Sequence, residues 1–76
     1  MVLIGVISGE YQGNKYYRLI FTEKLDRAGC YGDNAISSRC TRDCFEKARS
    51  DIDLFLGNKV IANYDRFGKV QDINLM

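Results

Sequence analysis

The sequence contains no histidine, no tryptophan and no proline, and it has three cysteines. Histidine is the side chain used most often as a general base near neutral pH and as a metal ligand, so its absence argues against many hydrolases and most zinc enzymes. Without proline, an edge strand has to be protected in another way, such as sheet closure or pairing with a second subunit. We therefore expect a binding module, not an enzyme.

The chain also lacks an excess of charge and a long apolar run. Lys and Arg number 11 against 10 Asp and Glu, and the 46% hydrophobic content excludes a disordered polyelectrolyte or a histone-like basic protein. No run approaches the roughly 18–20 apolar residues of a membrane span, and residues 1–7 lack the basic flank and the length of a signal peptide. With 76 residues we expect one domain, residues 1–76, that is soluble and has no membrane partner.

The three cysteines, Cys30, Cys40 and Cys44, form an odd set, which favours a reducing compartment such as the cytoplasm over a secreted disulfide framework. A zinc site would need a carboxylate or water as its fourth ligand, and the spacing matches no zinc knuckle. A catalytic thiolate at Cys44 would have the N-terminus of a helix beside it but no histidine base. We expect no metal and no cofactor.

The first half of the chain reads as strands. Residues 2–7 are apolar on both alternating faces, which predicts a strand covered on two sides or entering a closed barrel. Turn residues at 9–14 then lead into a second strand at 15–22, where Tyr17 belongs to the core face and Tyr16 to the opposite face. Residues 23–34 have no steady period and predict a long loop, after which residues 35–40 form a short third strand.

The second half begins with a helix. Thr41 is a suitable N-cap, apolar residues recur at helical spacing, and Gly57 suits the left-handed position after the last turn, so we expect a helix over residues 42–56. Residues 59–64 and 69–75 then predict a second hairpin, with Gly68 at a left-handed position in its turn.

The resulting order, β-β-(β)-α-β-β, predicts a mainly β fold with one helix. Two hairpins that flank a helix are typical of a small OB-like barrel, the oligonucleotide- and oligosaccharide-binding fold. The alternative is an open ββαββ sheet covered by the helix.

Aromatic and cationic residues alternate on the strands and loop tips. Single-strand binding needs aromatic platforms for bases beside cations for phosphates. Tyr16 shares its face with Arg18, Tyr31 lies in a glycine-flanked loop and Phe67 lies at a hairpin tip, although tip aromatics also cap small cores. The candidate nucleic-acid-binding residues are Lys15, Tyr16, Arg18, Arg27, Tyr31, Arg66, Phe67 and Lys69. Arg39 and Arg42 bracket the start of the helix, where they could hold a phosphate, but we interpret them as solvated charges that pair with Asp43 and Glu46.

Two hairpin segments, Gly-Glu-Tyr-Gln-Gly-Asn-Lys-Tyr at 9–16 and Asn-Tyr-Asp-Arg-Phe-Gly-Lys-Val at 63–70, carry a resemblance of layout. The chain resembles the small single-stranded-DNA-binding proteins of phages and conjugative elements, the helix-destabilising type built on a short β-barrel. The resemblance covers the terminal thirds and leaves residues 23–40 unmatched. It implies binding to single strands through exposed aromatics and cations, often as a homodimer, with a loop acting as a wing.

Two functions therefore stay open. The first is a non-enzymatic single-stranded nucleic-acid-binding module. The second is a small protein-interaction or oligomerisation domain in which Tyr16, Tyr31 and Phe67 fill a partner's surface, and the balanced charge favours it. The small core and the absence of proline at any edge also predict a homodimer.

Overall fold

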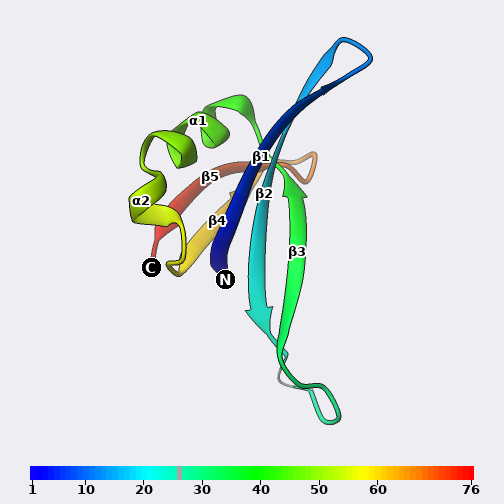
Figure 1. Ribbon diagram of the computed structural model, residues 1–76, viewed down its shortest axis with the longest axis vertical. Coiled ribbons are helices and arrows are strands. Elements are labelled where there is room, and N and C mark those ends of the chain that lie inside the picture. Colours follow the sequence, from blue (N-terminus) through cyan, green and yellow to red (C-terminus); the bar gives the residue numbers. More distant parts are fainter. Residues whose placement is uncertain (26) are drawn as a thin grey trace.

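The computed structural model describes residues 1–25 and 27–76, so Asp26, in the predicted 23–34 loop, lies outside the described residues. The fold is mainly β with a short helical segment, as the sequence predicts (Figure 1). Its elements are β1 (Val2–Tyr11), β2 (Asn14–Lys24), β3 (Asp33–Arg39), α1 (Arg42–Ser50), α2 (Ile52–Phe55), β4 (Val60–Tyr64) and β5 (Val70–Leu75). Neither helix in the described part of the chain has the length and apolar character that crossing a bilayer requires.

The first sheet is antiparallel in the order β1-β2-β3. Its first hairpin is longer than the sequence predicts, because the ladder continues through Glu10 opposite Lys15 to Tyr11 opposite Asn14. The turn itself is Gln12 and Gly13, whose φ angles of 50° and 81° are both left-handed. A two-residue turn of this hand matches the twist of the strands that it joins, so pairing extends to the tip.

β3 confirms the short third strand predicted at residues 35–40, with bounds of Asp33–Arg39. It pairs with β2 from Arg18 opposite Arg39 to Lys24 opposite Asp33. The loop between them is therefore shorter than the predicted 23–34. Few residues of β3 favour strands by themselves, so the ladder offered by the well-formed β2 overrides the weak local preference.

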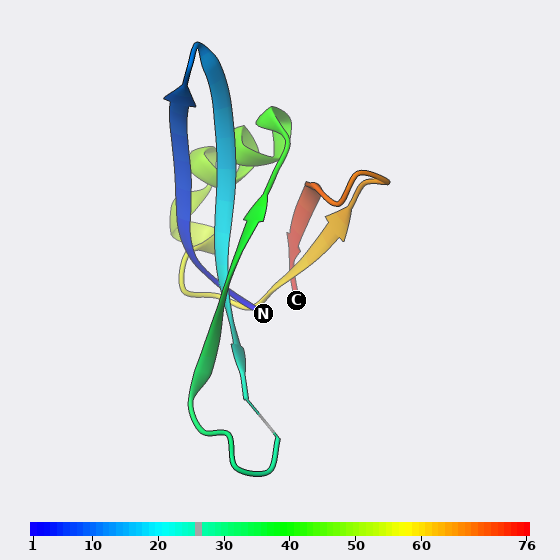
Figure 2. The ribbon, with the colours of Figure 1, turned by 90° about the vertical axis from the view of Figure 1, so that its right-hand side faces the viewer.

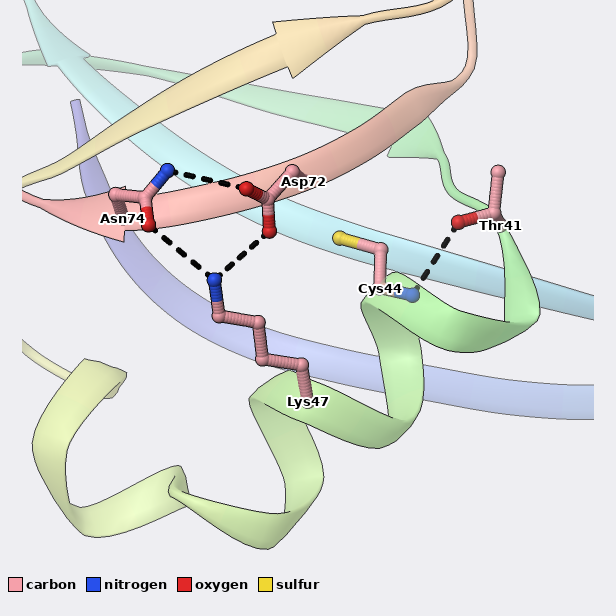
Figure 3. A network of polar contacts seen from close by, with 5 residues as sticks. All are labelled: Thr41, Cys44, Lys47, Asp72 and Asn74. Carbon is pink, nitrogen blue, oxygen red and sulfur yellow. Dashed lines mark hydrogen bonds and ion pairs between the residues drawn. The ribbon is translucent and has the colours of Figure 1, made fainter.

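The helical segment begins as predicted, with the Thr41 hydroxyl accepting the backbone N–H of Cys44 at 3.2 Å (Figure 3). The prediction of one helix over 42–56 is wrong, because Asp51 leaves helical geometry at φ −113° and ψ 38° and divides the segment into α1 and α2. Aspartate competes for backbone hydrogen bonds and is a poor helix interior residue, which favours a break there. Gly57 follows with a φ of 80°, the left-handed angle expected of it.

The core lies between the helical segment and the two sheets. Its fully or almost fully buried side chains are Leu3, Leu19, Phe21, Cys40, Cys44, Phe45, Ala48, Phe55, Val60, Val70 and Ile73. Tyr17 packs against this cluster, and its ring centroid lies 5.0 Å from that of Phe45. The sequence predicts that residues 2–7 are covered on two sides or enter a closed barrel. In the single chain they are not covered on both sides, because Ile4 and Ile7 are 48% and 39% exposed. The helix covers one face of the first sheet only.

The second sheet pairs β4 with β5, which confirms the second hairpin. The two sheets meet at isolated bridges, Val2 with Lys59 and Cys40 with Val70. Among the described residues the strands therefore form two sheets, and neither a continuous closed ladder nor the alternative single open ββαββ sheet is observed.

A polar contact fixes α1 against β5. The Lys47 ammonium group donates to the Asp72 carboxylate at 2.8 Å and to the Asn74 amide oxygen at 3.2 Å (Figure 3). The hydrogen bond from Lys47 lowers the pKa of the Asp72 carboxyl group below its usual value.

Candidate functional site

A cleft opens where the chain leaves β3 for α1. β3 ends at Arg39. Just beyond it, the Cys40 N–H donates a backbone hydrogen bond of 3.0 Å to the Tyr17 carbonyl oxygen of β2. The β1–β2 hairpin extends beyond that point (Figure 2). The cleft, of about 380 Å³, is lined by Lys15, Tyr16, Tyr17, Arg39, Cys40, Thr41, Arg42 and Lys69. We call it the junction cleft, and its volume falls in the range of small-ligand sites.

A second hollow continues from the junction cleft along the outer side of the β1–β2 hairpin. It shares Lys15, Tyr16 and Arg39 with the junction cleft, so the two form one surface, which we call the basic face. The second hollow is lined by Glu10, Tyr11, Asn14, Lys15, Tyr16, Arg18 and Arg39.

The basic face has an excess of cations, although a neighbouring hollow that shares Lys15, Tyr17 and Arg42 with the junction cleft also contains Glu46. Among the described residues, the basic face holds five of the chain's eleven cations and a single acid, Glu10. Its cations are Lys15, Arg18, Arg39, Arg42 and Lys69. A concave surface with this balance attracts anionic groups although the net charge of the chain is close to zero.

The cations of the basic face are free to bind an anion. The ion pairs found in residues 1–25 and 27–76 are Lys47 with Asp72 and Arg49 with Glu46, at 2.8 and 3.0 Å, and neither includes a residue of this face. Arg39 and Arg42 are exposed, as predicted for solvated charges, but the predicted pairing with Asp43 and Glu46 is not among these ion pairs. Glu46 is engaged by Arg49, which lies on the same side of α1.

Tyr16 and Tyr17 take opposite sides of β2, as the alternation predicts. Tyr17 is half-buried against Phe45, whereas Tyr16 is 40% exposed on the outer face of the sheet. The strand partner of Tyr16 is Gly9, and a Cβ atom built on Gly9 would overlap the Tyr16 ring. The phenol ring therefore lies across the β1 backbone at Gly9, and its remaining surface is open to solvent.

The β4–β5 turn carries three of the predicted residues. The Asp65 carboxylate accepts the backbone N–H groups of Phe67 and Lys69 at 2.8 and 2.9 Å, which fixes the turn. The Arg66 guanidinium lies 5.0 Å from the centroid of the Phe67 ring, and Phe67 is 71% exposed. Lys69 reaches the junction cleft, but Arg66 and Phe67 do not line it.

Arg27 and Tyr31 lie elsewhere. Both belong to the loop between β2 and β3, at the opposite end of the long axis from the tip of the β1–β2 hairpin (Figures 1 and 2). Tyr31 is 90% exposed, and Arg27 borders a separate hollow that also includes Glu23. The structure thus brings Lys15, Tyr16, Arg18 and Lys69 together and leaves Arg27, Tyr31, Arg66 and Phe67 outside the basic face.

Sequence reasoning missed Tyr11 as a member of this face, and it considered Arg39 and Arg42 as phosphate contacts but favoured solvated charges. Tyr11 lies within what the sequence marks as a turn, and the structure shows that this segment is strand. Arg39 reaches the face because it stands opposite Arg18 in the ladder. Residue order alone does not give that register, so the sequence does not place Arg39 beside Arg18.

Cys40 lines the junction cleft, and Cys44 is buried next to it. A hydrogen bond between the two thiols, together with burial, raises the pKa of the Cys44 thiol, and the same hydrogen bond lowers the pKa of the Cys40 thiol. A thiol held in the protonated form is a poor nucleophile. Cys30 is exposed in the distant loop, and no three potential metal ligands gather in the described part of the chain.

Comparison of the chain with family models, with curated proteins and with solved structures finds no match. The case for a function therefore rests on the geometry and the charge of the basic face.

Proposed function

We propose that the five strands form an OB-like barrel in the order β1-β2-β3-β5-β4. The antiparallel bridge between Val2 and Lys59 sets β1 beside β4, and the parallel bridge between Cys40 and Val70 sets β3 beside β5. The helical segment lies between β3 and β4 in the chain. A five-stranded, partly open barrel is the OB architecture, which binds ligands on the face of strands 2 and 3 and at the loops joining strands 1–2 and 4–5.

We further propose that the protein is a non-enzymatic module that binds single-stranded nucleic acid along the basic face. The observation that carries this proposal is the gathering of two exposed tyrosines, Tyr11 and Tyr16, with five cations that form no ion pair within residues 1–25 and 27–76. Cations neutralise the phosphates of a single strand, and exposed rings stack on its bases. The surface lies on β2 and the end of β3, between the β1–β2 and β4–β5 turns, which is where an OB barrel binds.

Each part of the face has a distinct task in this proposal. Arg39, Arg42 and Lys69 surround the junction cleft and hold phosphates of the strand. Tyr16 borders both hollows, and its ring stacks on a base of the strand where the two hollows meet. Arg18 keeps its guanidinium near the outer face through a hydrogen bond of 3.3 Å to the Ser37 hydroxyl group.

The test is a titration of a fluorescently labelled dT oligomer, followed by anisotropy at several salt concentrations. Each phosphate neutralised contributes about −0.7 to the slope of log K against log salt. Arg39→Gln should therefore weaken binding and reduce the slope by about that amount. Arg27→Gln makes the same chemical change in the distant loop and should leave both unchanged.

Two results would contradict the proposal. Absence of binding by the parent protein at low salt would remove the nucleic-acid function. Equal effects of Arg39→Gln and Arg27→Gln would show that binding does not occur on the basic face.

A second candidate function, self-association, is favoured by the free edge of β1. β1 is an outer strand of its sheet, and beyond its contacts near Leu3 no strand of the described residues lies along residues 5–11. Ile4 and Ile7 are exposed on this strand. An unpaired edge with apolar side chains is a template for pairing with a second chain, so we propose that the protein forms a homodimer.

A further inference from the structure

We propose that Gly9 is a positioning residue, which allows the Tyr16 ring to lie across β1 and so makes this ring a stacking platform for one unpaired base. The inference rests on the proposed function of the basic face and names the part of a ligand that Tyr16 recognises. Lysine and arginine side chains alone would bind any polyanion. A ring that is held in place adds a preference for polymers with accessible planar bases.

The backbone at Gly9 gives no other reason for a glycine. Its φ angle is not left-handed, unlike those of Gly13, Gly29, Gly32, Gly57 and Gly68. Glycine in the interior of a strand weakens it and often marks a close approach by another group. At Gly9 that group is the Tyr16 side chain, because a Cβ atom there would overlap the outer half of the ring and its hydroxyl oxygen.

The consequence is a ring with one covered side and one open side. Tyr16 and Gly9 are direct partners in the ladder, so the ring crosses from β2 to the glycine backbone of β1. An aromatic ring packed over a strand glycine shields that backbone and stabilises the register. The ring is already restricted before a ligand arrives, and less freedom remains to be lost when a base stacks on its open side.

Gly5 provides a matched control in the same strand. Gly5 and Gly9 lie on the same side of the sheet, and neither has a left-handed φ angle. A Cβ atom at Gly5 would meet the Ile20 side chain at 3.8 Å, an ordinary van der Waals distance. Gly5→Ala therefore fits, whereas Gly9→Ala displaces the Tyr16 ring.

The experiment is a double-mutant cycle in which the affinity for a labelled dT oligomer is measured by anisotropy. Tyr16→Ala should weaken binding by roughly 5- to 150-fold, the range seen when a stacking ring is removed. Gly9→Ala should weaken binding by a large part of that factor, without changing the slope of log K against log salt. When Tyr16 is already alanine, Gly9→Ala should not weaken binding further. Gly5→Ala and Tyr16→Phe should bind like the parent. The inference would be overturned if Gly9→Ala bound like the parent. It would also be overturned if Gly9→Ala weakened binding equally with and without the Tyr16 ring.

Urea unfolding of the same variants without a ligand separates this inference from the proposed function. Gly9→Ala should be less favourable for stability in the parent than in the Tyr16→Ala background, because only the ring opposes the new methyl group. If this coupling is absent, the positioning role is wrong even when the protein binds oligomers. If the coupling is present and the parent binds no oligomer, the packing stands, but the proposed function and the platform role both fail.

Discussion

Replacing Phe45 with alanine should lower the free energy of unfolding by about 3–5 kcal/mol, the usual loss for a phenylalanine removed from a core. Phe45 is 6% exposed, and its ring lies 5.0 Å from that of Tyr17 at an interplanar angle of 38°. It is the largest side chain that α1 places in the core. A domain of this length has a total stability of roughly 4–11 kcal/mol, so the substitution removes a large share of it.

Because Phe45→Ala can leave too little folded protein to measure, Phe45→Leu is the second variant. It removes roughly two methylene equivalents of buried surface and should lower the stability by about 1–2 kcal/mol. Phe67→Ala is the matched control, since it deletes the same ring from a side chain that is 71% exposed. Its effect should stay within about 0.5 kcal/mol.

The assay is urea denaturation followed by far-UV circular dichroism. With a denaturant dependence of about 1 kcal/mol per molar, Phe45→Leu should lower the unfolding midpoint by roughly 1–2 M. Phe67→Ala should have nearly the midpoint of the parent. If Phe45→Ala were as stable as the parent, α1 would not pack on the first sheet through this face, and the position of the junction cleft would be wrong.

Two further outcomes are expected. The Lys47–Asp72 contact should contribute under about 1 kcal/mol, because both groups are partly exposed. Because the pKa of Asp72 is lowered in the folded protein, this contribution is complete above the unfolded pKa of about 3.9 and is lost as the pH falls through the folded value. In urea melts, Asp72→Asn should therefore be less stable than the parent at pH 7, and the difference should shrink as the pH falls below about 3.9. The unfolding midpoint should rise with protein concentration if β1 edges pair in a homodimer, and a constant midpoint across a hundredfold dilution, with a light-scattering mass of one chain, would refute the dimer.

The local elements are the part that the sequence determined by itself. Turn glycines, the Thr41 cap and the alternation in β2 act within a few residues of one another, so their outcome depends little on the rest of the chain. The mainly β fold, the two hairpins and the opposite faces of Tyr16 and Tyr17 follow from these signals. The break at Asp51 was missed because one unfavourable residue inside an apolar helical pattern does not show by itself where the helix divides.

The composition of the basic face was decided by the tertiary structure. Arg39 meets Arg18 through the register of β2 and β3, and Lys69 reaches the junction cleft because the parallel bridge holds the start of β5 beside Cys40. Arg27 has the same residue type as Arg39, yet the length of the β2–β3 ladder carries it to the other end of the molecule. Sequence pattern gives the side of a strand on which a side chain lies, but strand pairing decides which side chains gather, because it joins residues that are distant in the chain.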